Sequence, residues 1–188
     1  PRRYVGWFLS PGVVPGAMLT VVSDTHSTDT HRLSGRTLEA VRDAEVVVHA
    51  GDFMRESVLD DFEREASRLL GVTGNNDDAA IRRRLPEART LTFGGCTFAG
   101  THTHRGGPTA LSLFGRQRDA DVVLFGHSHR PTYDPGGDVV LVNPGSHAQP
   151  RGNRAAHAEF EARGTGVSGR LVTVDGEVFE EFTIEPGV

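Results

Sequence analysis

The sequence predicts an α/β protein in which two sheets pack face to face and helices cover the outside of both. Three observations support this fold class. Apolar strand-like runs alternate with helical stretches through most of the chain, which is typical of parallel strands covered by helices. The last third contains short alternating segments that favour antiparallel pairing. Polar residues follow successive strands, which places them at one edge of a sheet.

Composition limits the classes of protein to consider. The 188 residues are 37% hydrophobic and 24% charged, as expected for one soluble globular domain. Their 20 basic residues, all of them Arg, and 25 acidic residues give a formal net charge of −5, so no stable nucleic-acid complex is expected. The single cysteine, Cys96, predicts a reducing, cytoplasmic location. No apolar run approaches the roughly 20 residues that span a membrane.

The first two thirds of the chain carry the strand and helix alternation. Residues 1–17, which Pro and Gly interrupt, are expected to form an N-terminal extension outside the core, and residues 18–188 a single domain. Apolar runs predict strands at 18–23, 45–52, just before Gly74, 89–94, 96–101 and 121–126. Apolar residues at helical spacing predict helices at 35–43, 55–70, around 82–84 and near 108–118.

The helix at 55–70 has the longest apolar stripe, which runs through Val58, Leu59, Phe62, Ala66, Leu69 and Leu70. In the last third, short strands are expected at 138–142, 155–162, 167–174 and 177–184. Asp175-Gly176 predicts a hairpin between the last two, because both residue types tolerate the turn that a two-residue loop requires.

Polar motifs follow five of the predicted strands. They are Ser-Asp24-Thr-His26, Gly51-Asp52, Gly74-Asn75-Asn-Asp77, His102-Thr-His104 and Gly126-His127-Ser-His129. In an open α/β sheet the carboxyl ends of the strands line one crevice, so these side chains are expected to converge. A single such motif is more often a capped loop or a turn than a metal site. The whole set is different, because buried polar groups without partners are costly and core packing has no use for them.

The chemistry of this set predicts a metal centre. Carboxylate, amide and imidazole ligands without a thiolate suit Mn, Fe, Zn, Co or Ni better than Ca or Mg. The ligands are too many for one tetrahedral ion but suit two ions that share a carboxylate. Two ions about 3.5–4 Å apart are the usual clamp for an in-line displacement at phosphorus.

These motifs resemble those of the calcineurin-like metallophosphoesterases, and within them the small bacterial and archaeal phosphodiesterases of the YfcE type. The family order is D-x-H, G-D, G-N, a histidine and G-H-x-H, and all five are present here. An N-P-G-S loop, typical of the small subfamily, stands at 143–146 and is followed by Pro150-Arg151. The resemblance implies a four-layer α/β/β/α sandwich of two mixed sheets, the metallophosphoesterase fold.

The resemblance also implies seven ligands for two divalent ions, with manganese expected and Ni, Fe, Co and Zn as alternatives. The ligands are Asp24, His26 and His129 for one ion, Asn75, His102 and His127 for the other, and Asp52 between them. Thr103 stands where the family usually has Gly, so the ligand at this position is either His102, which is preferred, or His104. With His102 as the ligand, His104 is expected in the second sphere or near the leaving group.

The implied activity is that of a metal-dependent phosphodiesterase, in which a metal-bridging hydroxide attacks phosphorus. Many members carry a general-acid histidine where this chain has Asn76, which favours diesters over phosphoprotein substrates. Arg105 and Arg130 adjoin ligand motifs and are candidates for binding the phosphate of a small phosphodiester or nucleotide. The alternatives are a weakly active or non-catalytic Vps29-like interaction scaffold, and a nucleotide or dinucleoside-polyphosphate hydrolase. A homo-oligomer is left open.

Other polar residues are expected to have structural roles. His49 lies in an apolar strand and is expected to be a satisfied core histidine. His31 and His157 are expected to face solvent. His147 follows the N-P-G-S loop, and the sequence favours neither a position near the site nor one away from it. The run Arg82–Arg84 is expected on a solvated helix face, and contact with an anionic substrate is the less favoured alternative.

Overall fold

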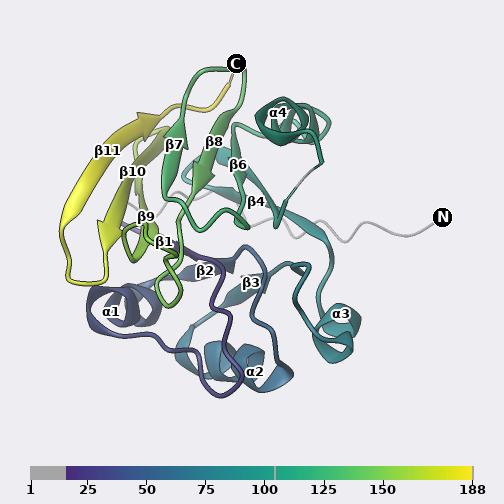
Figure 1. The fold of residues 1–188 in the computed structure, drawn as a ribbon. Helices are drawn as coiled ribbons and strands as arrows, with labels where there is room; N and C mark the ends of the chain where they lie inside the picture. The colour runs from purple at the N-terminus through teal and green to yellow at the C-terminus, as the bar shows by residue number, and fades with distance from the viewer. Residues whose placement is uncertain (1–15, 104, 188) are drawn as a thin grey trace.

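The computed structural model describes residues 16–103 and 105–187, which form two mixed sheets with helices on their outer faces (Figure 1). His104 and residues 1–15 of the predicted extension lie outside the described residues. Gly16 and Ala17 form main-chain hydrogen bonds with Ala162. None of the helices in the described ranges is long and apolar enough to cross a membrane.

The first sheet has six strands in the order β11-β10-β9-β1-β2-β3. They are β1 (Met18–Val22), β2 (Val46–His49), β3 (Leu69–Gly71), β9 (Ala156–Arg163), β10 (Gly166–Thr173) and β11 (Val178–Ile184). The strands β1, β2 and β3 are parallel, whereas β9, β10 and β11 pair antiparallel. The predicted turn at Asp175-Gly176 joins β10 to β11.

The second sheet has five strands in the order β4-β5-β6-β8-β7. They are β4 (Ala88–Phe93), β5 (Cys96–Thr101), β6 (Val122–Leu124), β7 (Thr132–Asp134) and β8 (Val140–Asn143). The three central strands are parallel and the two edge strands antiparallel. The strand β7 was not predicted, because three residues are too few to show a period.

Three apolar clusters separate the layers. The largest lies between the sheets and includes Leu19, Phe98 and Phe160. The helices α1 (Gly35–Asp43), α2 (Glu56–Glu65) and α3 (Ala79–Arg84) supply Val41, Phe62 and other residues to a second cluster with the first sheet. Helix α4 (Gly107–Arg116) packs on the second sheet in the third cluster. The predicted four-layer sandwich is therefore confirmed.

The helix predicted at 55–70 ends earlier, at Glu65. Leu69 and Leu70, which continue its apolar spacing, instead pair with Val47 and Val48 as strand β3. Two adjacent apolar residues fit either structure, so periodicity cannot separate them. The parallel pairing with β2 decides the outcome.

His157 was predicted to face solvent, and this prediction is wrong. It is fully buried on β9, where Nδ1 lies 2.9 Å from Thr37 Oγ1 and Nε2 lies 2.8 Å from Glu159 Oε1. Helix α1 covers this face of the strand, and Arg36 from that helix donates two hydrogen bonds of 2.9 Å to Glu159. Arg170 also donates a hydrogen bond to Glu159, at 2.6 Å. The polar face of β9 is thus an internal charge network.

Substitution of Glu159 should destabilise the fold. Burial opposes ionisation of this carboxyl, but hydrogen bonds from its three neighbours outweigh burial and hold its pKa well below the ordinary value. Its contribution to stability is therefore present above about pH 4.3 and is lost as the pH falls below that value. We expect Glu159→Gln to lower the free energy of unfolding by about 1.5–3 kcal/mol at pH 7, because it removes the buried charge that Arg36, Arg170 and His157 contact.

The measurement is urea unfolding between pH 3 and pH 7. Glu161→Gln is the matched control, because Glu161 lies on the same strand, its side chain is 35% exposed, and it pairs only with Arg163 within the described residues. An equal loss in both variants would contradict the special role of Glu159.

Candidate metal centre

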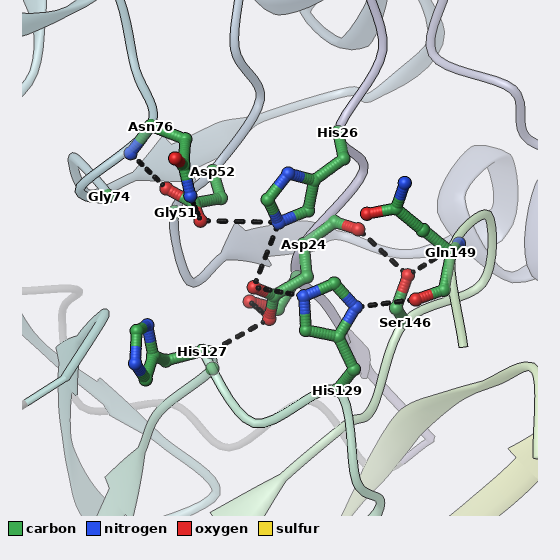
Figure 2. Close-up of polar contacts among 12 residues, drawn as sticks. Asp24, His26, Gly51, Asp52, Gly74, Asn76, His127, His129, Ser146 and Gln149 are labelled. Atoms are coloured by element: carbon green, nitrogen blue, oxygen red, sulfur yellow. Dashed lines mark hydrogen bonds and ion pairs between the residues drawn. The ribbon is translucent and has the colours of Figure 1, made fainter. Parts of the chain in front are cut away.

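Five strand ends from both sheets deliver the predicted ligands to one crevice. Asp24 and His26 follow β1, Asp52 follows β2, and Asn75 follows β3. From the second sheet, His102 follows β5, and His127 and His129 follow β6. Figure 2 shows the side chains of Asp24, His26, Asp52 and His129 turned toward a common space. The convergence expected from the sequence is present.

Five of these residues place side-chain atoms close together in a buried cluster. Asp24 Oδ1 lies 3.4 Å from His129 Nε2, 3.6 Å from His26 Nε2 and 4.0 Å from His102 Nε2. Asp52 Oδ2 lies 3.2 Å from both His26 Nε2 and His102 Nε2. Two ligand atoms that bind one cation at about 2.1 Å lie roughly 3–3.4 Å apart. The spacing therefore suits divalent cations.

The same atoms lack hydrogen-bond partners. Asp24 Oδ1 and the Nε2 atoms of His26, His102 and His129 are buried and unpartnered among the described residues. Leaving such groups unpaired costs about 1–3 kcal/mol each. A cation bound among these nitrogen and oxygen atoms would satisfy them together, so the residues present fit the metal that the motifs imply.

Outer contacts orient three of these side chains. The Nδ1 atom of His102 lies 2.7 Å from Ala50 O, and that of His129 bonds to Gln149 O, which leaves Nε2 of both rings toward the cluster. Asp24 Oδ2 accepts hydrogen bonds from Ser23 Oγ at 2.7 Å and from the His127 main chain at 2.9 Å. Its Oδ1 is thereby left for a cation.

Asn76 holds the other carboxylate. Its main-chain N–H donates to Asp52 Oδ1 at 2.8 Å, and its side-chain Nδ2 donates to Asp52 Oδ2 at 2.7 Å (Figure 2). The buried carboxylate of Asp77 in turn accepts from the main-chain N–H groups of Gly74, Asp52 and Met54, at 2.7, 3.2 and 2.8 Å. The loop after β3 is thus tied to the loop after β2.

The backbone at the site is unusual. Five predicted ligands adopt left-handed φ angles, which cost non-glycine residues energy and cluster at functional sites: Asp24 (54°), His26 (45°), Asp52 (61°), His127 (72°) and His129 (57°). Two glycines permit close packing behind the carboxylates. A Cβ atom on Gly74 would lie 2.1 Å from Asp52 Oδ1, and one on Gly126 would lie 2.7 Å from Asp24 Oδ2.

Charge coupling within the cluster is strong. The carboxylates of Asp24 and Asp52, at 3.6 and 3.2 Å from Nε2, raise the pKa of His26 to about 9. Burial opposes ionisation of Asp52, but the nearby imidazoles of His102 and His26 lower its pKa far below the ordinary value. Burial favours the neutral form of His102, yet Asp52 raises its pKa overall. Such carboxylates attract cations, and a bound metal competes with protons for the imidazoles.

Asn75 and His127 lie beside this buried cluster, at its exposed rim. Their side chains contact each other, with Asn75 Oδ1 and His127 Nδ1 3.0 Å apart. The His127 ring lies perpendicular to that of His102, with centroids 5.4 Å apart. Both residues are exposed to solvent. The structure therefore brings all seven predicted ligands together, five in the buried cluster and two at the rim.

Two cavities flank the cluster. The first, of about 490 Å³, is lined by Asn75 and His102 together with Arg82 and Arg105, and we call it the His102 cavity. The second, of about 680 Å³, is lined by His26 and Asn76 and is called the His26 cavity. A group bound at the cluster can therefore extend in two directions. Arg130 is exposed and lines neither cavity in the described part of the chain.

The remaining histidines have structural contacts. His49 is buried and accepts from Gly51 N–H at Nδ1, so Nε2–H donates to Thr25 at 2.9 Å and joins the loops after β1 and β2. This confirms a satisfied core histidine. His147 is buried, and burial lowers its pKa to about 4. Its Nε2 lies 2.9 Å from the carbonyl oxygen of His31, which is itself partly buried.

Sequence reasoning missed some functional contacts. Ser146 Oγ donates to Asp24 O at 2.7 Å, and the Gln149 carbonyl orients His129, so the N-P-G-S loop supports the cluster. The N-P-G-S motif could be recognised in the sequence, but its role in supporting the cluster could not. Arg82–Arg84 are exposed, as expected, but Arg82 also donates hydrogen bonds to Asp77 O and Asn75 O, both at 2.9 Å.

Comparison with known proteins gives a consistent result. The family model described as the calcineurin-like phosphoesterase superfamily domain matches residues 18–162. A probable metallophosphoesterase of Methanocaldococcus jannaschii is 30% identical over 74% of this chain and 73% of its own length. A phosphodiesterase of the same archaeon is 26% identical over 66% of this chain and 81% of its own. Vps29 of Chaetomium thermophilum shares the fold, with a TM-score of 0.76, 16% identity and coverage of 91% of this chain and 98% of that one.

Proposed function

Because the chain belongs to the calcineurin-like phosphoesterase superfamily, we propose that it is a metal-dependent phosphodiesterase. The observation that carries the proposal is a set of four buried atoms without hydrogen-bond partners among the described residues. They are Asp24 Oδ1 and the Nε2 atoms of His26, His102 and His129. A purely structural cluster would satisfy these atoms within the protein. The phosphodiesterase among the relatives supports the reaction class.

In this proposal Asp24, His26 and His129 hold one divalent ion, and His102 holds the other with Asn75 and His127 from the rim. Asp52 lies between them, supported by its equal 3.2 Å distances to His26 and His102. When bound, the two ions would neutralise charge on the phosphate and lower the pKa of water. Manganese is our first choice, with Ni, Fe, Co and Zn as alternatives for this donor set.

The chain's own residues favour diesters. Asn76 stands where many members of the family have the general-acid histidine. Its side-chain amide donates a hydrogen bond to Asp52 and supplies no proton to a leaving oxygen. Arg105 lines the His102 cavity, which supports a role in binding the phosphate. The same role for Arg130 is supported only by its position next to His129. The two flanking cavities suit a phosphate that carries an ester group on each side.

The test is hydrolysis of bis(p-nitrophenyl) phosphate beside p-nitrophenyl phosphate. Metal-stripped protein should be inactive, and added Mn or Ni should restore activity on the diester with little on the monoester. Equal activity on both esters would contradict the reading of Asn76.

A Vps29-like scaffold is the second candidate, favoured by the shared fold. It predicts that the protein binds ions yet hydrolyses neither ester with any of the metals named above. A nucleotide or dinucleoside-polyphosphate hydrolase is a narrower form of the first proposal. We also propose a cytoplasmic location from the single buried thiol of Cys96, whose pKa burial raises to about 12. A homo-oligomer would use the edge strand β11.

A further inference from the structure

The His102 cavity is rich in arginine. Arg82, Arg105 and Arg118 line it, and Glu87 is the acidic side chain that faces them among the described lining residues. A neighbouring cavity of about 410 Å³ shares Arg118 and adds Arg89. The protein as a whole carries a formal net charge of −5. The cationic character of these two cavities is therefore local and differs in sign from the whole chain.

Arg82 and Arg118 keep their charge uncompensated. Arg82 donates to the main-chain oxygens of Asp77 and Asn75, both at 2.9 Å, and these are neutral acceptors. Arg118 donates to Phe114 O at 3.1 Å. Among the described residues, no carboxylate lies within 4.0 Å of either guanidinium.

Two arginines close to them in the sequence differ. Arg84 contacts three carboxylates, on Glu56, Asp60 and Glu63, at 2.6–3.1 Å. Arg116, two residues before Arg118, faces Asp138 at 3.7 Å. Arg82 and Arg118, which have no carboxylate contact in the described part of the chain, both line the cavity beside the metal centre.

Arg118 is also held in place. Its guanidinium carbon lies 3.8 Å above the centre of the Phe114 ring, a cation–π contact that orients the group while leaving its charge available. A guanidinium fixed in this way loses little freedom when it binds a phosphate, which it can contact with two parallel N–H groups.

We propose that the His102 cavity binds a second phosphate, carried on one arm of the phosphodiester substrate. This inference rests on the proposed phosphodiesterase function and names its substrate class: small nucleotide-type diesters with a phosphate beyond the one that is cleaved. The scissile phosphate lies at the cluster, and Arg118, with Arg82, binds the second phosphate.

The test compares three dinucleotides with the same diester bond: dithymidine monophosphate, its 5′-phosphorylated form and its 3′-phosphorylated form. With the Mn-loaded protein, one phosphorylated form should have a kcat/KM on the order of tenfold higher than the parent. Arg118→Gln should abolish this preference and leave the parent dinucleotide unchanged, and Arg118→Lys should restore part of it. Arg116→Gln is the matched control and should keep the full preference.

Binding separates this inference from the proposed function. Thymidine 3′,5′-bisphosphate should bind the metal-stripped full chain in calorimetry, on the order of tenfold more weakly to Arg118→Gln than to Arg116→Gln. Equal binding by the two variants, or equal kcat/KM for all three dinucleotides, would overturn the second-phosphate site. Failure to hydrolyse any dinucleotide would contradict the phosphodiesterase instead, and the binding comparison would still decide the site.

Discussion

Asp52→Asn is expected to reduce metal-dependent hydrolysis of an aryl phosphodiester by more than about 100-fold, because even the outer partners of metal ligands contribute about 10- to 100-fold. The Asp52 carboxylate reaches two imidazoles at 3.2 Å and accepts two hydrogen bonds from Asn76. Asparagine keeps the shape of the side chain but removes the charge that would face both ions. The measurement is kcat/KM for bis(p-nitrophenyl) phosphate at saturating Mn, together with the thermal unfolding midpoint.

Asp43→Asn is the control for Asp52→Asn. Asp43 is an exposed residue at the end of α1, away from the loops that carry the ligands, and its substitution should leave activity unchanged. A folded Asp52→Asn variant with full activity would show that this carboxylate does not hold catalytic metal.

Gly74→Ala is expected to reduce activity strongly without any change in a ligand. The added Cβ would lie 2.1 Å from Asp52 Oδ1 and 2.3 Å from Asp52 N, far inside van der Waals contact. Relief requires the carboxylate or the loop after β2 to move, and a displacement of 1 Å at a reacting centre can cost about 100-fold in rate. We expect a loss of kcat/KM of that order or more, and weaker Mn binding in calorimetry.

Gly100→Ala is the matched control, because Gly100 lies on β5 just before His102 and its added Cβ would have its nearest neighbours at 3.9 Å. It should bind Mn and hydrolyse the diester normally. If Gly74→Ala behaved in the same way, close packing behind Asp52 would not be what positions the carboxylate.

Most of the candidate site could be predicted because its chemistry lies in short motifs at strand ends. Asp24, His26 and Asp52 each follow an apolar strand within a few residues, and the parallel order of β1 and β2 brings them together. The rule that strand ends share one edge needs no long-range information. His102, His127 and His129 follow β5 and β6 in the same way, and the packing of the two sheets brings the two sets of strand ends to one crevice.

What the sequence could not predict depends on contacts between distant segments. His157 and Glu159 look like the outer face of a half-exposed strand until α1, more than 100 residues earlier, is placed over them. Arg82 is exposed, as expected for the charged run to which it belongs. Its role in lining the His102 cavity arises because the chain after β3 curls back to present the oxygens of Asn75 and Asp77.

Departures from regular backbone are the other hidden feature. His127 and His129 adopt left-handed φ angles that local propensity disfavours, and no sequence pattern indicates them. These conformations persist because outer contacts, such as the bond from His127 N to Asp24 Oδ2, hold the loop in place.

The most direct test of the central claim is a Mn titration of the metal-stripped protein, in which bound ions and hydrolysis of bis(p-nitrophenyl) phosphate are measured in the same samples. The account predicts two ions per chain and activity that rises only as the second one binds. A protein that binds two ions and hydrolyses nothing, or that hydrolyses the diester without metal, would contradict it.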